Sequence, residues 1–369
     1  EPVTKILSDS TNAKTFYAKW IANPDKAVYN KITGGMYHFL ALDKEGSLFA
    51  WGLNHNGQCG NGNTQNLLRP TQIMIGTTFK EIAAGTSNSL AIDKDGNLYI
   101  WGENGIGQLG NEEIELSTIP VKIMEGTKFT KVVAGGNHYL AIDELGKLYT
   151  WGENSKGQLG NGTSNNVTTP SIIMSDKTFK SISAGFESSV AITTDGKLYV
   201  WGANEEGNLG DGSRENKNTP INIQAEVNFE SVEHSTGLNY FLAIDENGNI
   251  WGVGDNSQGQ LGDGTLENKT ELTQITTDIV FTKVATGYNH TLALDENGNL
   301  YVCGSNLNGQ LGDETGERKT RITKVFANVK FEDIDATWSS NIAIRENNTL
   351  YVWGENNYGQ LGDGTTNST

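Results

Sequence analysis

The sequence predicts an all-β protein that folds as a seven-bladed β-propeller of four-stranded blades. Three observations support this prediction. A motif of Trp-Gly, Asn and Gly-Gln-Leu-Gly, or a close variant, recurs seven times at intervals of about 50 residues. Each interval contains four short runs rich in β-branched and aromatic residues, separated by Gly, Asp and Asn. The chain also begins with a run of the kind that its last interval lacks.

The motif indicates one ring rather than two domains, although a chain of 369 residues could form two. Repeats of this length pack against their neighbours, so seven of them form one closed structure. We interpret the motif Trp and Leu as wedges between blades, and the recurrent Asn as part of the loop structure. The copies begin at Trp51, Trp101, Trp151, Trp201 and Trp353, with Val253 and Cys303 at this position in the other two.

Within one repeat the runs predict four strands, which we name A to D. In the second repeat they cover residues 79–85, 88–93, 97–102 and 120–124. A tight turn, Asp93-Lys94-Asp95-Gly96, joins B to C, and its Gly can adopt a positive φ. Because antiparallel strands alternate in direction, the A–B turns and the C–D loops should emerge on the same face of the ring.

The two ends of the chain predict how the ring closes. The last repeat, residues 330–354, is not followed by a strand D, whereas residues 2–6 (Pro-Val-Thr-Lys-Ile) resemble strand D at 120–123. We therefore expect residues 1–7 to complete the last blade, which removes an open edge. The single domain, residues 1–369, would then comprise this closing strand, an atypical insert at 8–30 and seven repeats at 31–369.

The insert at 8–30 is expected to contain a short amphipathic helix. Its apolar residues Phe16, Tyr17, Trp20 and Ile21 have i and i+4 spacing, and the following Asn-Pro pair would end a helix. The helix could cover the mouth of the channel or the edge of a blade. We favour a structural cap over a partner-binding helix.

The composition is acidic, with 27 Lys and Arg against 44 Asp and Glu, a formal net charge of −17 and a pI near 4.7. Such a surface repels phosphate backbones and anionic lipid, so we expect no binding to nucleic acid. No apolar run approaches the roughly 20 residues of a membrane helix, so we expect no membrane insertion. We expect the propeller to be a monomer.

The first residue is Glu, which indicates a processed or trimmed end and leaves export open. Together with the Asn-rich, Cys-poor composition, this slightly favours a bacterial protein that is secreted or held at the cell surface, with the cytosol as the alternative. The cysteines replace apolar residues of the repeat, and we interpret them as small buried side chains rather than a disulfide. They are Cys59 and Cys303.

The sequence contains no catalytic constellation, and we expect no enzymatic activity, no bound metal and no cofactor. The Asp-Gly loops at Asp211, Asp263 and Asp363 lack the later Glu of a calcium loop, so we interpret them as turns. Three histidines share one position of the repeat, which favours hydrogen bonding at a strand end over metal binding. They are His38, His138 and His290.

Upstream of the motif, Gly-x-x-His-x-Leu-Ala-Leu occurs at 35–42 and 287–294. With the repeated Trp-Gly-x-Asn-x-x-Gly-Gln-Leu-Gly, the chain resembles the regulator of chromosome condensation repeat family over nearly its whole length. The resemblance implies a seven-bladed propeller. It does not imply one function, since similar propellers act as a guanine-nucleotide exchange factor on chromatin, as inhibitors of secreted β-lactamases, as a plant ultraviolet photoreceptor and as bacterial effectors on host GTPases.

Two of these family functions are disfavoured by the residues. The exchange factor inserts a wedge from one blade into its GTPase, and here no blade carries an insertion larger than two residues, between Phe229 and Gly237. The photoreceptor groups several Trp residues in the turn after strand A, and here only Trp338 occupies such a turn.

Comparing the repeats at variable positions reveals an apolar arc. The residue after the Gly position of the A–B turn is large and apolar in blades 4, 5, 6, 7 and 1, which are neighbours in a closed ring. These residues are Phe186, Leu238, Tyr288, Trp338 and Met36, whereas blades 2 and 3 have Thr86 and Gly136. The same arc carries Tyr37 from an A–B turn and Tyr358, Leu307 and His55 from C–D loops.

We interpret this arc as a protein-binding site. Aromatic side chains present roughly 150 to 250 Å² each, so several partly exposed ones approach the roughly 800 Å² per partner of an ordinary interface. The alternative is that these side chains fold over the central channel and plug it. The sequence therefore predicts a non-catalytic scaffold that binds another protein through the A–B and C–D face. The alternative function is a guanine-nucleotide exchange factor or effector acting on a small GTPase.

Overall fold

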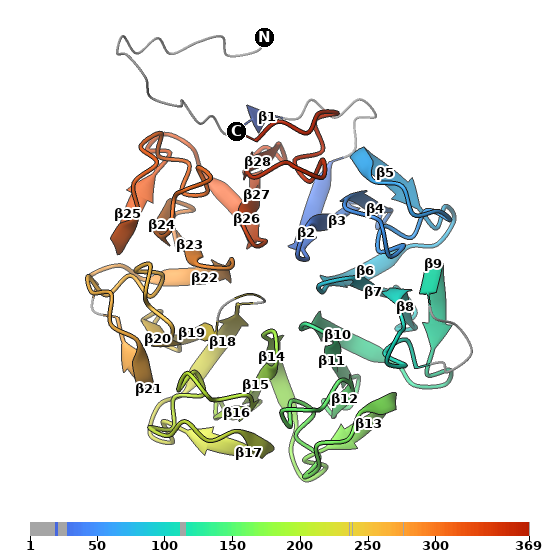
Figure 1. Cartoon of the computed structure of the whole chain (residues 1–369), viewed down its shortest axis with the longest axis horizontal. Helices are drawn as coiled ribbons and strands as arrows, with labels where there is room; N and C mark the ends of the chain where they lie inside the picture. The colour runs from blue at the N-terminus through green and yellow to red at the C-terminus, as the bar shows by residue number, and fades with distance from the viewer. Residues whose placement is uncertain are drawn as a thin grey trace.

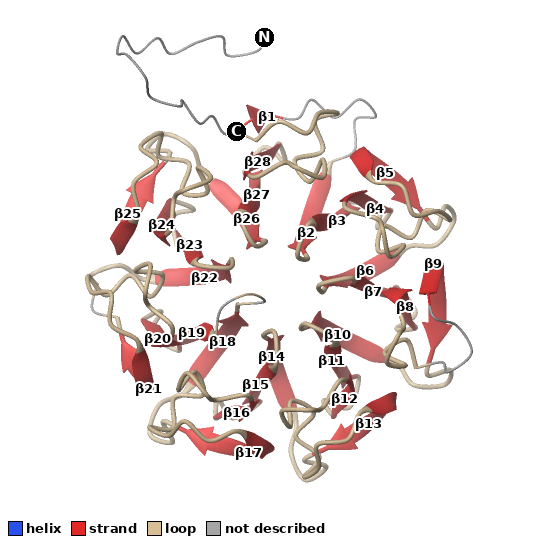
Figure 2. Ribbon diagram, in the orientation of Figure 1, coloured by secondary structure: helices blue, strands red, loops and turns tan. Residues whose placement is uncertain are grey.

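The computed structural model describes residues 19–20, 28–110, 116–235, 237, 239–275 and 277–368. Within these residues the regular elements are all strands, and they form seven four-stranded antiparallel sheets arranged as blades around a central axis (Figures 1 and 2). The predicted all-β, seven-bladed propeller is confirmed. The described part of the chain contains no helix suited to crossing a membrane.

The first three strands follow one another from the axis outward in every blade, and the fourth continues this order in blades 1 to 6 (Figure 1). Blade 1 contains β2 (Tyr29–Gly34), β3 (His38–Asp43), β4 (Leu48–Gly52) and β5 (Leu67–Ile73). Blade 2 contains β6 (Phe79–Ala84), β7 (Asn88–Asp93), β8 (Leu98–Glu103) and β9 (Leu116–Ile123). Blade 3 contains β10 (Phe129–Ala134), β11 (His138–Asp143), β12 (Leu148–Gly152) and β13 (Val167–Ile173). Blade 4 contains β14 (Phe179–Ala184), β15 (Ser188–Thr193), β16 (Leu198–Gly202) and β17 (Lys217–Ile223).

The remaining blades repeat this order. Blade 5 contains β18 (Phe229–His234), β19 (Tyr240–Asp245), β20 (Ile250–Gly254) and β21 (Lys269–Gln274). Blade 6 contains β22 (Phe281–Thr286), β23 (His290–Asp295), β24 (Leu300–Gly304) and β25 (Lys319–Val325). Blade 7 contains β26 (Phe331–Ala336), β27 (Ser340–Arg345) and β28 (Leu350–Gly354), with β1 (Lys19–Trp20) as its outer strand.

The A–B turns and C–D loops lie on one face of the propeller, and the B–C turns lie on the opposite face. The backbone N–H of Leu53, in a C–D loop, donates to the carbonyl of Tyr37, in an A–B turn, at 2.9 Å. On the other face, the N–H of Phe79, where strand A of blade 2 begins, donates to the carbonyl of Gly46 in the B–C turn of blade 1 at 2.8 Å. Gly46 has a φ of 84°, as this tight turn requires. The A–B turns and the C–D loops therefore share one face, as the sequence predicts.

Neighbouring blades are joined by the motif Trp. The indole Nε1–H of Trp101 donates to the carbonyl of Gln58, in the C–D loop of the preceding blade, at 2.8 Å. The same carbonyl accepts the hydroxyl proton of Ser89 at 2.7 Å. Both donors come from blade 2, and both side chains are fully buried. The interpretation of this Trp as a wedge between blades is thus confirmed, with a hydrogen bond at its tip.

Four further Trp residues make the equivalent bond. The pairs are Trp51 with Gln360 (2.9 Å), Trp151 with Gln108 (3.1 Å), Trp201 with Gln158 (2.8 Å) and Trp353 with Gln310 (2.9 Å). The first of these joins blade 1 to blade 7 and so closes the ring. In blade 6 the thiol of Cys303 lies 3.4 Å from the carbonyl of Gln260. Cys303 and Cys59 are free and buried, as the sequence predicts.

The expected closing strand, residues 1–7, lies outside the described residues and stays a prediction. Among the described residues, the outer strand of blade 7 is β1, which pairs antiparallel with β28 through Lys19 with Val352 and Trp20 with Tyr351. These two residues were expected in a short helix, and they form a strand instead. Residues 8–18 and 21–27 of the insert lie outside the described part, and Tyr29 and Asn30 already belong to β2.

Replacing Trp101 by Phe should lower the free energy of unfolding by about 1–3 kcal/mol, because it removes a buried hydrogen bond and leaves a small cavity. Urea unfolding followed by circular dichroism measures this loss. Trp251→Phe is the control, because Trp251 is only half-buried and its Nε1–H donates to the Asp245 carboxylate inside its own blade at 3.0 Å. It should lose less.

The shared carbonyl also predicts coupling between its two donors. Either Trp101→Phe or Ser89→Ala leaves Gln58 with one donor, whereas the double variant leaves its buried carbonyl with neither. The double variant should therefore lose more stability than the sum of the single variants. Purely additive losses would show that the carbonyl does not join the two residues energetically.

Candidate protein-binding face

The A–B turns form a connected rim around one mouth of the channel. Each turn is closed within its blade, as where the N–H of Gly287 donates to the carbonyl of His290 at 2.8 Å. Some turns are also bonded to the next blade: the N–H of Tyr288 donates to the carbonyl of Trp338 at 3.2 Å, and that of Met36 to Gly85 at 3.2 Å. Side chains on this rim are therefore held on rigid backbone.

Four of the predicted site residues form one aromatic cluster: Tyr37, Tyr288, Trp338 and Tyr358. The ring centroids of Tyr288 and Trp338 lie 4.6 Å apart, those of Trp338 and Tyr37 5.6 Å, and those of Tyr37 and Tyr358 4.9 Å. The cluster thus runs without a break from blade 6 across blade 7 to blade 1. All four side chains remain partly exposed.

The other predicted site residues that the structure describes are not among these ring contacts. Phe186 lies on blade 4 with 40% of its surface exposed, and Leu307 lies on a C–D loop of blade 6 with 80% exposed. His55 is exposed on a C–D loop of blade 1, and Met36 is half-buried on the rim. Leu238 lies outside the described residues. The predicted arc is therefore one aromatic cluster with separate apolar residues beside it.

Carboxylates surround this face, and the sequence comparison did not identify them. The residue two positions after the motif Trp, or after the residue that replaces it, is acidic in four blades: Glu103, Glu153, Asp255 and Glu355. In blade 4 this residue is Ala203, and its N–H donates to the carbonyl of the acidic rim residue Glu187 at 2.9 Å. Aligning this position across the repeats would have found them.

One of these carboxylates, that of Glu355, acts electrostatically on the aromatic cluster. Burial raises the pKa of the Tyr37 phenol, and the nearby Glu355 carboxylate is the second cause of the rise. Glu355 is also held at the surface by a hydrogen bond of 2.5 Å from the Asn357 amide to its Oε1. The aromatic cluster is therefore bordered by negative charge.

Beneath the rim, the innermost strands of all seven blades line a channel with a cavity of about 200 Å³. Its walls carry charged pairs between neighbouring blades, such as Lys31 with Glu81 at 2.5 Å and Lys283 with Asp333. Desolvation, followed by the nearby Asp335 charge, raises the pKa of the carboxyl of Glu233, a half-buried residue of the channel wall. The channel wall is thus polar and braced by ion pairs.

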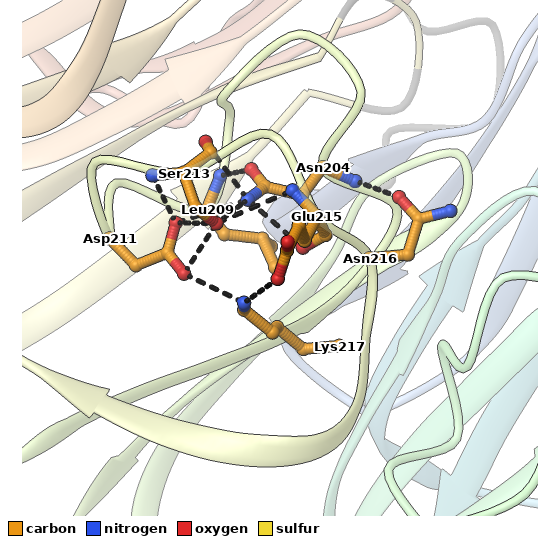
Figure 3. A network of polar contacts seen from close by, with 7 residues as sticks. All are labelled: Asn204, Leu209, Asp211, Ser213, Glu215, Asn216 and Lys217. Carbon is orange, nitrogen blue, oxygen red and sulfur yellow. Dashed lines mark hydrogen bonds and ion pairs between the residues drawn. The ribbon is translucent and has the colours of Figure 1, made fainter.

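The C–D loops are built on the recurrent Asn of the motif, as Figure 3 shows for Asn204. Its Oδ1 accepts the N–H of Leu209 at 2.8 Å, and its Nδ2 donates to the Asp211 carboxylate at 3.1 Å. Asp211 also accepts from the Ser213 hydroxyl at 2.8 Å and pairs with Lys217 at 3.3 Å. The interpretation of Asn as loop structure is confirmed, and the Asp211 carboxylate has protein donors on both oxygens.

The histidines at the shared repeat position are buried and bridge blades. His38 Nε2 lies 2.8 Å from the Ser89 hydroxyl oxygen, and His138 Nε2 lies 2.9 Å from that of Ser189. His290 Nε2 lies 2.7 Å from Asn341 Oδ1. Since Ser89 and Ser189 donate their own protons to Gln carbonyls, these two rings donate through Nε2. Their interpretation as hydrogen-bonding residues is confirmed.

Burial lowers the pKa of these imidazoles. The pKa falls to about 3 for His38 and His138 and to about 4 for His290, with desolvation as the largest cause. In each ring Nδ1 is buried without a hydrogen-bond partner among the described residues. A second proton would therefore place an unsolvated charge between blades. Among the described residues, no group of three or more His, Cys, Asp and Glu is placed to hold a metal ion.

Comparison with known families matches the whole repeat region. A model of the RCC1-like domain matches residues 107–369. Models of the regulator of chromosome condensation (RCC1) repeat match residues 45–92, 30–58 and 79–108. The order of motif, strand and turn is therefore that of a known repeat.

Solved structures with the same fold include human WBSCR16, at 19% identity, a TM-score of 0.77, and coverage of 89% of this chain and 88% of that one. Prp20p from Saccharomyces cerevisiae, studied with its binding to Gsp1p and histones, matches at 21% identity, a TM-score of 0.74, and coverage of 89% and 83%. Yeast RCC1 (Prp20) bound to Kap60 matches at 20% identity, a TM-score of 0.77, and coverage of 100% and 89%. At these identities the likeness shows the fold.

The buried histidines predict acid sensitivity. Their folded pKa values lie below the value of about 6.5 expected in the unfolded chain, so the unfolded state binds more protons below pH 6.5. Stability should fall as the pH falls from about 6.5 towards the folded values, by up to about 1.4 kcal/mol per pH unit for each histidine. Urea unfolding at several pH values measures this slope.

Replacing His138 by Asn, the residue that blade 2 has at this position, should reduce the slope by about one proton near pH 5. His55→Asn is the matched control, because His55 is exposed, and it should leave the slope unchanged. The slope is compared between each variant and the parent, because the raised pKa of Glu233 changes stability in the opposite direction as the pH rises. An unaltered slope in His138→Asn would contradict the prediction.

Proposed function

The chain belongs to the RCC1-like domain family, and from this premise we propose that it is a non-catalytic propeller that binds a partner protein through the face of A–B turns and C–D loops. The observation that supports this proposal best is the aromatic cluster of Tyr37, Tyr288, Trp338 and Tyr358, which is continuous and partly exposed. Exposed apolar surface gathered in one place is typical of contact sites.

The rim presents these rings in a form suited to binding. The Tyr288 and Trp338 rings contact each other, and their backbones are hydrogen-bonded across blades 6 and 7. Side chains that are already ordered lose little conformational entropy when a partner docks. Tyr and Trp are also the residues that most often contribute a large share of binding energy. The aromatic cluster therefore serves as the anchor in this proposal.

The two thiols and the inter-blade imidazoles are placed unfavourably for catalysis, which supports a non-catalytic role. Burial raises the pKa of the Cys303 thiol to about 12, and it raises that of Cys59 further, so neither supplies a thiolate near neutral pH. The inter-blade histidines are fully buried and hydrogen-bonded within the structure. These residues stabilise the ring rather than face a substrate.

Proteins of the same fold support partner binding as the kind of function. Prp20p was studied for its binding to Gsp1p and histones, and yeast RCC1 (Prp20) was crystallised with Kap60. A guanine-nucleotide exchange factor or effector acting on a small GTPase is the second candidate in this chain. Adding the propeller to a panel of GTPases loaded with fluorescent nucleotide distinguishes the two, because a passive binder leaves the release rate unchanged.

Replacing Trp338 and Tyr288 by Ala should abolish most partner binding while leaving the fold intact. Each true anchor should cost about 2 kcal/mol or more in binding free energy, or roughly thirtyfold in affinity. The parent and the double variant are compared in pull-downs, and each retained protein is then measured by calorimetry. Their circular dichroism and melting temperatures report on folding.

Leu145→Ala is the matched control for this experiment. Leu145 has 76% of its surface exposed and lies in a B–C turn on the opposite face, so its loss should not alter binding. Equal affinity of the double variant and the parent for every partner would refute the site. A partner lost equally in the control variant would point to non-specific apolar adsorption.

A further inference from the structure

The negative charge on the binding face follows the repeat. The carboxylates of Glu103, Glu153, Asp255 and Glu355 occupy one position in four blades, and Glu187 is placed beside the same position in blade 4. We name these five residues the carboxylate ring. Four of them are tied to an A–B turn through a backbone hydrogen bond, and Glu187 lies in such a turn. The carboxylates therefore border the channel mouth in blades 2, 3, 4, 5 and 7.

The carboxylate ring lacks matching cations. Among the described residues, none of the ion pairs includes a member of the ring. Their hydrogen bonds come from neutral groups, as where the Ser155 hydroxyl donates to Glu153 at 3.0 Å and the Gln260 amide to Asp255 at 3.1 Å. These bonds orient the carboxylates without neutralising them.

Around Phe186 the like charges are close enough to interact. Burial raises the pKa of the Glu187 carboxyl, and the Glu153 and Glu205 charges raise it further, against the opposing effect of Lys156. Lys156 is itself paired with Glu205 at 2.6 Å. The exposed Phe186 side chain therefore lies on a rim whose local charge is unbalanced and negative.

Aromatic faces and carboxylates together suit a cationic side chain. The face of an aromatic ring attracts Lys and Arg, and the attraction is strongest for Trp. Arg combines this contact with hydrogen bonds to a carboxylate, because its guanidinium is planar and carries several donors. Trp338, Tyr37 and Glu355 lie together on the described surface in the arrangement that such a group would use.

We propose that the occupant of this face is a basic segment of the partner protein, which places an Arg or Lys side chain on the aromatic cluster and further cations against the carboxylate ring. The inference rests on the proposed function and adds the chemistry of the partner to it. Complementary charge of this kind raises the association rate and excludes acidic competitors. It also makes binding sensitive to salt.

Selection from a random library of peptides tests the proposal even before a partner has been identified. The intact propeller is the target, and peptides that still bind the Trp338→Ala, Tyr288→Ala double variant are discarded. The remaining peptides should have a net positive charge and contain Arg or Lys beside an apolar residue. Their affinity should fall about tenfold or more as NaCl rises from about 50 to about 500 mM, because the Debye length shrinks.

Two matched variants then test the carboxylate ring itself. The ring variant carries Glu103→Gln, Glu153→Gln, Glu187→Gln, Asp255→Asn and Glu355→Gln. The control variant makes the same change in charge in the B–C turns of the opposite face, with Glu45→Gln, Asp95→Asn, Glu144→Gln, Glu246→Gln and Glu296→Gln, all of which are exposed. The selected peptides should lose about tenfold or more in affinity for the ring variant and less than about twofold for the control variant.

The outcomes distinguish failure of the basic partner from failure of the proposed site. Peptides that require Trp338 and Tyr288 but are neutral or acidic, or that bind the ring variant as well as the parent, would overturn the basic partner and leave the proposed site standing. Failure to select any peptide that requires Trp338 and Tyr288 would overturn both. Equal losses in the ring and control variants would assign the effect to net charge, and would also overturn the role of the ring.

Discussion

The structure depends on a hydrogen bond made at the tip of a buried Trp. The indole of one blade donates to a Gln carbonyl in the loop of the blade before it, with distances of 2.8–3.1 Å at five of the seven junctions. The carbonyl cannot leave this site without losing a buried hydrogen bond, so it fixes the C–D loop against its neighbour. Each blade therefore fixes the position of the C–D loop of the blade before it.

This constraint separates the residues that build the ring from those free to vary. The Trp, Gln and Asn of the motif are committed to inter-blade and loop hydrogen bonds, whereas the Tyr288 and Trp338 side chains of the A–B turns contact each other on the rim. Because the A–B turns are closed by backbone groups, we expect substitution at their tips to be tolerated. Tyr37, Tyr288 and Trp338 of the aromatic cluster lie in these turns. Tyr358 lies in a C–D loop, and four members of the carboxylate ring lie at the end of strand C or just after it.

The repeat made most of the fold predictable, and the site only in part. Seven copies of the motif determine the blades and the common face, because the same residues are used at each step. The contact of Tyr37 with Trp338 and Tyr358 depends on the spacing across the junction of blades 7 and 1, which no local pattern encodes. For the same reason Leu307 and His55 could be placed on the correct face but not in the cluster. The strand formed by Lys19–Trp20 was missed because amphipathic spacing over so few residues does not distinguish helix from strand.

The blades that depart from the motif show how the constraint can be replaced. Blade 5 has Val253 where five of the repeats have Trp, and its A–B turn is longer by two residues. There His234 bridges to blade 4. Its ring Nε2 lies 2.8 Å from the Ser188 hydroxyl oxygen, and its backbone N–H donates to Ser183 Oγ at 2.9 Å. On the other side, the Tyr240 hydroxyl donates to the carbonyl of His290 at 2.6 Å. The buried polar contacts at both junctions of blade 5 thus come from residues that the other repeats do not share. The propeller therefore requires hydrogen-bonded polar groups at each junction rather than Trp itself, and this allows the longer turn to be accommodated.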